Sequence, residues 1–402
     1  MAILSLFLMS KFGLEKTQST IIYSVFYALI YLLALVGGII ADRTKKYKGT
    51  ILIGLLLMAV GYLLIAIPTP TPVPNFALYL TMTCLGLFVI AFGNGLFKGN
   101  LQAVVGQMYD KPEYASKRDT GFQIFYMFIN VGALFAPLIA VGIRNWWVER
   151  NGFAYNSDLP ALCHKYIDGT IQPEALQRLT NLSAEVSANG TPADLTEFAN
   201  QYLNVFNTGF HYAFGAAIIA MLISITIYLT NKNNLPNPAL KSKSSSDNSQ
   251  EVEMSVAEIK QRLYALFAVF GVVIFFWFSF HQNGVTLTFF ANDYTNLSQI
   301  NINLGFTSIK GAEIFQFFNP FFVVFLTPVV IGLFGWLKAR GKEPSTPRKI
   351  AIGMGIATIA FIVMAVGSFG LPSADEVKAV GGLPDAARVT PFLLIGTYFI
   401  LT

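Results

Sequence analysis

Eight stretches of about 20 almost entirely apolar residues constrain this chain more than any other feature of its sequence. They cover residues 20–41, 49–67, 77–99, 121–143, 209–230, 262–291, 312–336 and 349–370. A helix needs about 20 mostly apolar residues to cross the hydrocarbon core of a bilayer. Only 12% of the 402 residues are charged, which is about half the share found in soluble domains. We therefore predict an all-α protein that crosses a membrane many times.

The same composition excludes a disordered chain, a nucleic-acid-binding domain and an ordinary water-soluble enzyme. With 54% hydrophobic residues, a soluble protein of this size would expose large apolar patches. The net charge of +5 lies in the loops and fits a lipid bilayer better than nucleic acid. Two cysteines, Cys84 and Cys163, cannot make a disulfide framework or a metal site. We expect neither catalysis nor a bound metal or cofactor.

Two shorter apolar runs, 1–12 and 391–402, lie at the ends of the sequence. The first lacks the basic segment and the small-residue cleavage site of a signal peptide, so we interpret it as the second half of a spanning helix. We therefore expect a fragment of a longer protein, without the start of helix 1 and without everything after the middle of helix 10.

The distribution of Lys and Arg predicts the orientation, since cytoplasmic loops are enriched in both. If residue 1 lies in a helix that runs outward, the inner loops hold 17 basic residues and the outer segments hold 9. We therefore expect the N-terminus and the central linker in the cytoplasm, and the segment 144–208 on the periplasmic side.

A polar stretch divides the chain near its middle. Residues 231–261 are rich in Ser, Lys and Asn, which predicts a cytoplasmic linker. It separates an N-terminal bundle of six helices (1–230) from a C-terminal bundle of four (262–402). Each bundle has a short basic loop between its second and third helices, a layout typical of the major facilitator fold. On the outer side, the segment 150–208 includes QPEALQRLTNLSAEVSANG, which predicts short amphipathic helices of unassigned function.

Lys98 is the basic residue that this interpretation places inside a helix, in AFGNGLFKGN. A lysine at the centre of a spanning helix costs about 2.5–3.5 kcal/mol by insertion scales. One explanation is that Lys98 reaches the cytoplasmic headgroups. Its distance of about three turns from Asp110 and its neighbours Gly95 and Gly99 favour a binding or coupling role. The surrounding GNGLFKGN lacks the strand–loop–helix context of a phosphate-binding loop.

His281 is a second ionisable group in an apolar stretch, FFWFSFHQNGVTLTFFAND. It follows Trp277 by four residues, so we expect the two rings to stack on one helix face. A histidine can change its charge near physiological pH, but a neutral histidine packed inside the bundle explains the pattern equally well.

Four further polar residues lie in or beside apolar runs. His211 and Glu313 are expected at helix ends within reach of water, and we interpret both as structural. Asn130 and Asn319 are expected in mid-helix, where their amides must bond either a neighbouring helix or a substrate.

Five segments together resemble the proton-dependent oligopeptide transporter (POT/PTR) family of the major facilitator superfamily. They are GGIIADRTKKYKGTILIGLLLMAVGYLL, GNGLFKGNLQAVVGQMYD, RDTGFQIFYMFINVGALFAP, FFWFSFHQNGVTLTFFA and FQFFNPFFVVFLTP. They follow the family's order across nearly the whole chain. The resemblance implies import of di- and tripeptides with protons, by alternating access, across a bacterial cytoplasmic membrane. The energy source would be the proton gradient, and we expect the protein to function as a monomer.

The resemblance also implies roles for individual residues. Lys98 matches the lysine of the family's F-K-P-N motif, which serves peptide-carboxylate recognition and proton coupling. Asn130 and Asn319 match asparagines that bind the amino end and the backbone of the peptide. Tyr31 matches a second-helix tyrosine that lines the same cavity, and Trp277 matches an aromatic wall of it.

Three departures from the family pattern stand out. Gly99 replaces the proline that follows the lysine. His281 stands where most bacterial members have a glutamate, so proton coupling would have to use repulsion from Lys98 instead of a lost attraction. The first-helix E-x-x-E-R-F segment and the tenth-helix glutamate would lie outside residues 1–402.

Two alternatives to peptide import stay open. The same fold could transport another small solute, or it could serve as a non-transporting receptor or assembly partner. Lys98, Asn130 and Asn319 favour transport, because a scaffold gains nothing from polar groups in a shared cavity.

Overall fold

The computed structural model describes residues 3–110, 112–115, 118–188, 190–236, 256–300, 302–303, 305 and 307–402. The long helices are α2 (Lys16–Thr44), α3 (Tyr47–Ala66), α4 (Phe76–Met108), α6 (Arg118–Arg150), α9 (Leu195–Asn231), α11 (Val256–Phe280), α13 (Phe315–Ala339) and α14 (Thr346–Gly367). The shorter helices are α1 (Leu4–Phe12), α5 (Pro112–Ala115), α7 (Leu159–Ile167), α8 (Pro173–Val186), α12 (Thr286–Tyr294), α15 (Ala374–Ala379) and α16 (Pro391–Leu401).

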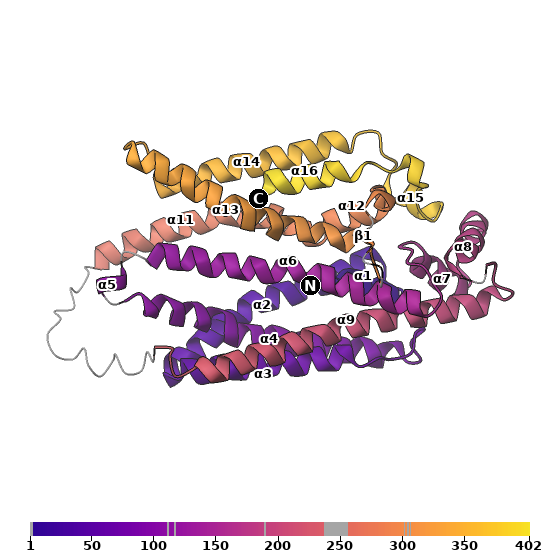
Figure 1. The fold of residues 1–402 in the computed structure, drawn as a ribbon, viewed down its shortest axis with the longest axis horizontal. Coiled ribbons are helices and arrows are strands. Elements are labelled where there is room, and N and C mark those ends of the chain that lie inside the picture. Colours follow the sequence, from indigo (N-terminus) through magenta and orange to yellow (C-terminus); the bar gives the residue numbers. More distant parts are fainter. Residues whose placement is uncertain are drawn as a thin grey trace.

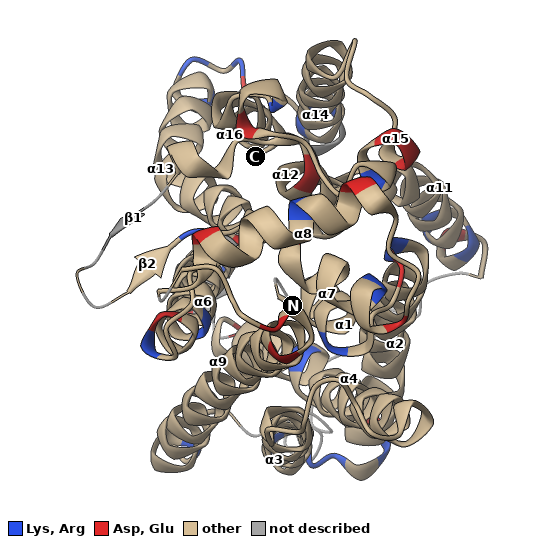
Figure 2. Cartoon of the chain, turned by 90° about the vertical axis from the view of Figure 1, so that its right-hand side faces the viewer, with Lys and Arg blue, Asp and Glu red and all other residues tan. Residues whose placement is uncertain are grey.

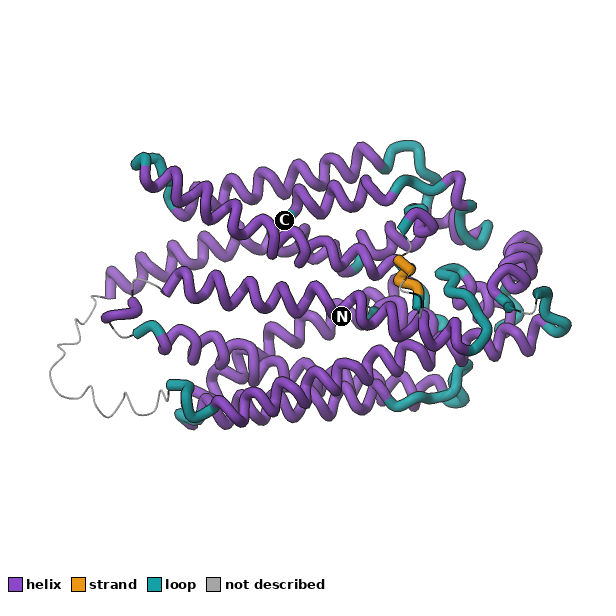
Figure 3. The backbone as a smooth tube through the Cα atoms, in the orientation of Figure 1, coloured by secondary structure: helices purple, strands orange, loops and turns teal. Residues whose placement is uncertain are grey.

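Tight turns and one small hairpin complete the structure. The 3-10 turns are η1 (His281–Gly284), η2 (Leu297–Gln299), η3 (Ala312–Ile314) and η4 (Asp385–Ala387). The strands β1 (Ile302–Asn303) and β2 (Ser308–Ile309) pair antiparallel, with Ile302 opposite Ile309. Figure 3 shows this hairpin near the end of the molecule that carries α7 and α8.

In the described part of the chain, eight helices are long and apolar enough to cross a membrane. This finding confirms the eight predicted spans. The two terminal apolar runs form the short helices α1 and α16. Figure 1 shows the helices lying side by side in two groups, which we call the N-terminal bundle (α1–α9) and the C-terminal bundle (α11–α16).

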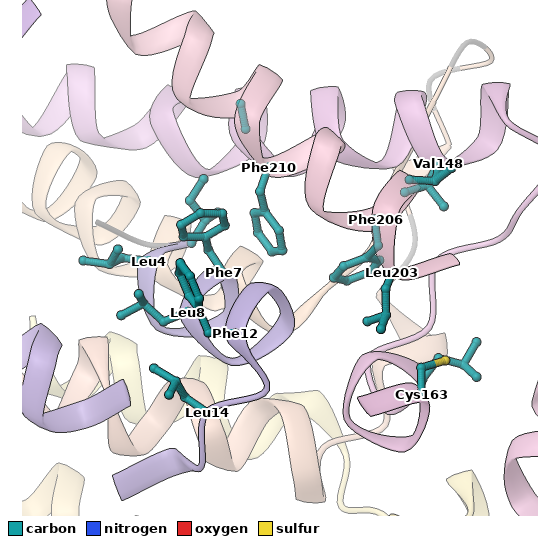
Figure 4. Packing of buried hydrophobic residues seen from close by; sticks show 14 of the residues in the cluster. Leu4, Phe7, Leu8, Phe12, Leu14, Val148, Cys163, Leu203, Phe206 and Phe210 are labelled. Carbon is teal, nitrogen blue, oxygen red and sulfur yellow. The ribbon is translucent and has the colours of Figure 1, made fainter. Parts of the chain in front are cut away.

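Buried apolar side chains hold each bundle together. In the N-terminal bundle, Phe7 of α1 packs against Phe210 of α9 with ring centres 5.8 Å apart, and Leu8 belongs to the same buried cluster, which Figure 4 shows. The same cluster continues to Cys163 of α7, and in the C-terminal bundle a separate cluster surrounds Phe315. The core therefore consists of one large cluster in the first bundle and smaller ones elsewhere.

Glycines bring α3 and α4 into backbone contact. A Cβ on Gly93 would lie 2.7 Å from the carbonyl oxygen of Gly54, and one on Gly61 would lie 2.8 Å from that of Gly86. Any larger side chain would push the two helices apart, since small residues allow helices in membranes to approach this closely. α3 and α4 are therefore interlocked along most of their length.

The stretch 262–291, predicted as one helix, is interrupted. α11 ends at Phe280, the turn η1 follows, and α12 begins at Thr286. At Gly284 the backbone approaches α2 so closely that a Cβ would lie 2.5 Å from the hydroxyl oxygen of Tyr23. The polar sequence HQNG and this close contact explain the break.

The outer segment 144–208 contains more helix than predicted. α6 continues to Arg150 and α9 already begins at Leu195, where the side chain of Asp194 accepts a hydrogen bond from the amide of Thr196 at 2.7 Å. The predicted amphipathic helix is confirmed as α8, which buries Ala175, Leu179, Ser183 and Val186 along one face. Of the predicted linker 231–261, residues 237–255 lie outside the described residues.

A buried ion pair joins the two bundles. Arg144 of α6 and Glu313 of η3 bond each other, and both side chains are fully buried. The guanidinium also lies 4.3 Å from the ring centre of Tyr155 and 5.1 Å from that of Phe210. The neighbouring Asn145 donates to the carbonyl oxygens of Ser308 and Lys310 at 2.7 and 2.9 Å. α6 is thus fixed to the segment that leads into α13.

The interpretation of Glu313 and His211 as water-accessible residues was wrong. Glu313 is buried by its pairing with Arg144. His211 lies inside α9, because that helix begins earlier than predicted, and its Nδ1 is 2.6 Å from the carbonyl oxygen of Ile65. Only 3% of the surface of His211 is exposed.

We expect Glu313→Gln to destabilise the protein strongly. The substitution leaves the guanidinium of Arg144 buried without a counter-charge, and removing one partner of a buried pair typically costs about 3–5 kcal/mol. Denaturant unfolding in detergent micelles measures the free energy of unfolding. Glu343→Gln is the matched control, since Glu343 pairs with Lys349 at the surface and exposed pairs contribute little. Equal midpoints for the two variants would contradict the assigned role of Glu313.

Candidate functional site

Three tyrosines follow one face of α2. Tyr23, Tyr27 and Tyr31 are spaced four residues apart, so they lie above one another on the helix. The ring centres are 5.7 Å apart between Tyr23 and Tyr27, and 5.6 Å apart between Tyr27 and Tyr31. α2 therefore presents a column of aromatic rings with hydroxyl groups.

Lys98 reaches this column from α4. Its Nζ lies 4.8 Å from the ring centre of Tyr31, a distance at which an ammonium group is attracted by the face of the ring. Among the described residues Lys98 makes no ion pair. Lys98 is therefore held by a ring and keeps its positive charge available for an anion.

His281 reaches the same column from the C-terminal bundle. Its ring centre lies 4.7 Å from that of Tyr27 and 6.3 Å from that of Tyr31. Trp277 stacks on His281 at 5.2 Å with an interplanar angle of 22°, which confirms the predicted stacking. We call Tyr27, Tyr31, Lys98, Trp277 and His281 the central cluster.

The central cluster brings both bundles to one place. Tyr31 and Lys98 belong to the N-terminal bundle, whereas Trp277 and His281 belong to the C-terminal bundle. An ammonium group binds carboxylates through charge-assisted hydrogen bonds, and an imidazole can take up a proton near neutral pH. The arrangement can therefore bind an anionic group and a proton where the two halves meet.

The two asparagines predicted as binding residues are not bonded to the central cluster in the described part of the chain. The side-chain amide of Asn130 donates to the carbonyl oxygen of Tyr126 in its own helix at 2.9 Å. That of Asn319 donates to the hydroxyl oxygen of Thr402 at 3.0 Å. Their binding role stays a prediction.

The sequence interpretation missed two buried cations. Arg144 is fully buried and Lys11 is 1% exposed. The Nζ of Lys11 donates to the carbonyl oxygens of Thr69 and Pro70 and to the hydroxyl oxygen of Thr71, at 2.5–3.0 Å. For Arg144 the signal was present, because the sequence continues as NWWV and extends the apolar run by a turn.

Further ion pairs join the bundles at the end of the molecule that carries α7, α8 and α15. Lys16 of α2 pairs with Asp293 of α12, and Glu15 pairs with Lys378 of α15 at 2.7 Å. The hydrogen bond from Lys378 lowers the pKa of the Glu15 carboxyl. Figure 2, which views the molecule from this end, shows the charged residues there. The bundles are tied together at this end, which we call the outer end.

Comparison with known proteins identifies relatives of this chain. The sequence profile of the POT family matches residues 48–255 and 239–402. The chain is 28% identical over 365 residues to an uncharacterized transporter, YclF, of Bacillus subtilis, and covers 65% of its length. It is 26% identical over 379 residues to a di-/tripeptide transporter of Lactococcus lactis subsp. cremoris, and covers 67% of that protein. Both alignments include 88% of the present chain. The chain spans about two thirds of the length of each of these relatives.

Solved structures show the same fold. The chain is similar to the crystal structure of a peptide transporter POT in complex with sulfate, with a TM-score of 0.59 and 23% identity. The whole chain is covered, together with 74% of that structure. A POT family transporter in complex with 5-aminolevulinic acid gives a TM-score of 0.59 at 20% identity, covering 76% of its chain. The predicted major facilitator fold is thereby confirmed.

We expect Gly284→Ala to loosen the contact that places His281 against α2. The added methyl group meets the hydroxyl of the buried Tyr23, and such overpacking typically costs about 1–3 kcal/mol. Gly271→Ala in α11 is the control, because a Cβ there meets nothing within 4 Å. Thermal unfolding in detergent should show a lower midpoint for Gly284→Ala only; two unchanged midpoints would contradict the close contact.

Proposed function

Because this chain belongs to the POT family, we propose that it imports di- and tripeptides together with protons across the bacterial cytoplasmic membrane. The observation that carries this proposal is the central cluster, in which Lys98, without an ion pair among the described residues, and His281 from the opposite bundle both lie against tyrosine rings of α2. The names of the relatives, among them the di-/tripeptide transporter of Lactococcus lactis and the peptide transporter YePEPT of Yersinia enterocolitica, support the choice of substrate.

In this proposal the central cluster binds the peptide. Lys98 attracts the peptide carboxylate, and Tyr31 and Trp277 form apolar walls beside it. Asn130 and Asn319 bond the amino end and the backbone of the peptide, which requires their present bonds to Tyr126 and Thr402 to exchange for bonds to substrate. Since Lys98 lacks a carboxylate partner among the described residues, a peptide would compete with no internal anion there.

His281 is proposed to carry the coupled proton. When the imidazole of His281 is neutral, it does not repel the positive charge of Lys98. When protonated, it places a second positive charge beside Tyr27 and Tyr31, and the two cations repel each other. Lys98 belongs to the N-terminal bundle and His281 to the C-terminal bundle. Repulsion between them would therefore favour separation of the two bundles around the site. In family members with a glutamate at the position of His281, protonation would free the lysine differently, because the neutral glutamate no longer attracts it.

Alternating access supplies the remaining steps. The ion pairs at the outer end are proposed to hold the outer entrance closed while the peptide leaves to the cytoplasm. We propose that the N-terminus and the linker face the cytoplasm and that the protein works as a monomer. It would need no cofactor and catalyse no reaction, since the proton gradient supplies the energy.

A second candidate is transport of another small solute that carries both an amine and a carboxylate. The structural neighbour in complex with 5-aminolevulinic acid favours it, because that ligand is an amino acid rather than a peptide. Competition of such solutes against labelled dipeptide uptake separates the two candidates.

We expect Lys98→Ala to abolish concentrative dipeptide uptake in proteoliposomes with an imposed proton gradient. A hydrogen bond to a charged group contributes about 1.5–3 kcal/mol, so uptake should fall at least about tenfold. Lys46→Ala serves as the control, because Lys46 is exposed at the start of α3. Uptake by Lys98→Ala at the parental rate would remove the central cluster from the mechanism.

We expect uptake to rise as the outer pH falls below about 6.5, the ordinary pKa of a histidine, since repulsion between the two cations opposes the protonation of His281. We expect His281→Gln to remove this step. His164→Gln is the matched control, because His164 lies in α7, outside the central cluster, where its Nε2 is 2.7 Å from the carbonyl oxygen of Ser10. If the curves of uptake against pH coincide for the parent and His281→Gln, then His281 is a packing residue.

A further inference from the structure

Residues 151–194 form a small unit on the outer side, which we call the outer cap. It contains α7 and α8 and connects α6 to α9. Leu162 of α7 and Leu179 of α8 belong to the same buried cluster as Phe198 and Tyr202 of α9. The hydroxyl of Tyr202 also donates to the carbonyl oxygen of Ala154 at 3.3 Å. The outer cap is therefore part of the N-terminal bundle and moves with it.

A shared carboxylate joins the outer cap to the C-terminal bundle. Oδ2 of Asp158 accepts a hydrogen bond from Arg178 of the cap at 2.7 Å and one from Arg388 at 3.0 Å. Arg388 lies between η4 and α16, in the C-terminal bundle. The side chains of Asp158 and Arg388 are only 11% and 6% exposed, so water competes little with this pair.

Two glycines let the C-terminal bundle approach the cap. Gly381 and Gly382 have φ angles of +75° and +118°, which residues with a side chain rarely adopt. A Cβ on Gly381 would lie 3.1 Å from the side chain of Leu162, and one on Gly382 would lie 2.7 Å from Oδ2 of Asp158. The backbone of residues 381–383 thus lies directly against α7 and α8.

The seam between the cap and the C-terminal bundle is polar. It contains a pocket of about 300 Å³ whose lining includes Glu185 of the cap and Lys310 and Asp385 of the C-terminal bundle. Arg178 reaches across to the carbonyl oxygen of Leu383 at 3.5 Å. A polar seam can separate at low cost, since water replaces the lost hydrogen bonds. Figure 2 shows α8 lying across the outer end, between the two bundles.

We propose that the outer cap is the surface with which the N-terminal bundle binds residues 381–388 of the C-terminal bundle, and that this contact closes the outer entrance. The Asp158–Arg388 pair breaks when the outer side opens, together with the ion pairs Lys16–Asp293 and Glu15–Lys378. This inference rests on the proposed alternating access, because only a relative movement of the bundles would separate the two surfaces. The proposal assigns a role to residues 151–194, for which the sequence alone indicated no function.

The test measures distance between the bundles rather than transport. Spin labels are attached through Asn181→Cys on α8 and Ala386→Cys on η4, with Cys84 and Cys163 replaced by Ala, and the distances are recorded in lipid nanodiscs. The parent should show mainly the short distance. Asp158→Asn should raise the ratio of long to short distances about tenfold. Loss of a hydrogen bond to a charged group changes an equilibrium constant by at least about this factor.

Two further variants decide whether the pair itself is responsible. Arg388→Gln should produce the same shift, and combining it with Asp158→Asn should add nothing. Glu174→Gln, an exposed position in the first turn of α8, should leave the distances unchanged. Parental distances in both single variants, or additive shifts in the double variant, would overturn the proposal. Variants that unfold are recognised by gel filtration, and Arg388→Lys, which keeps the charge, should then retain the parental distances.

This experiment separates the inference from the proposed function. If the distances shift but no peptide is ever taken up, the outer cap contact stands and the assigned substrate fails. If peptide uptake is measured while Asp158→Asn keeps parental distances, the transport proposal stands and the outer cap contact fails.

Discussion

Two opposite charges can leave water together where their pairing and further hydrogen bonds replace the lost hydration, and Arg144 and Glu313 satisfy this condition for each other. Their pairing fixes α6 to η3, and so sets where α13 begins. Asn145 extends the contact to the hairpin β1–β2 by bonding backbone carbonyls. This contact fixes the two bundles to each other at α6 and η3, and the close approach of Gly284 to Tyr23 sets His281 against α2.

The protein accommodates its buried or embedded cations in three different ways. Arg144 is neutralised by a carboxylate, and Lys11 is satisfied by three oxygen atoms of the α3–α4 connection. Among the described residues, Lys98 makes no ion pair and lies over the face of Tyr31, which attracts a cation without cancelling its charge. The first two arrangements contribute stability. The third leaves an unneutralised charge at the junction of the bundles, where a ligand can make use of it.

The sequence predicted most of the fold because apolar length is a local property that needs no knowledge of partners. It also predicted the stacking of Trp277 on His281, since both lie on one helix face. It failed where helices continue beyond the apolar run: α9 begins 14 residues earlier than the predicted stretch, which placed His211 at a helix end. Asp158 and Arg388 are 230 residues apart, and no local pattern indicates that such residues meet.

The length of α9 has a mechanical consequence. Its 37 residues span about 55 Å, whereas the hydrocarbon core is about 30 Å thick. The outer end of α9, which carries the outer cap, thus stands about 35 Å from the bilayer mid-plane when half that thickness is added to about 20 Å of helix outside it. A rigid rotation of about 15°, as seen in other switching proteins, would move that end by about 9 Å. Because α9 is so long, a small tilt of the helix within the bilayer would displace its outer end, and the outer cap with it, by about three hydrogen-bond lengths.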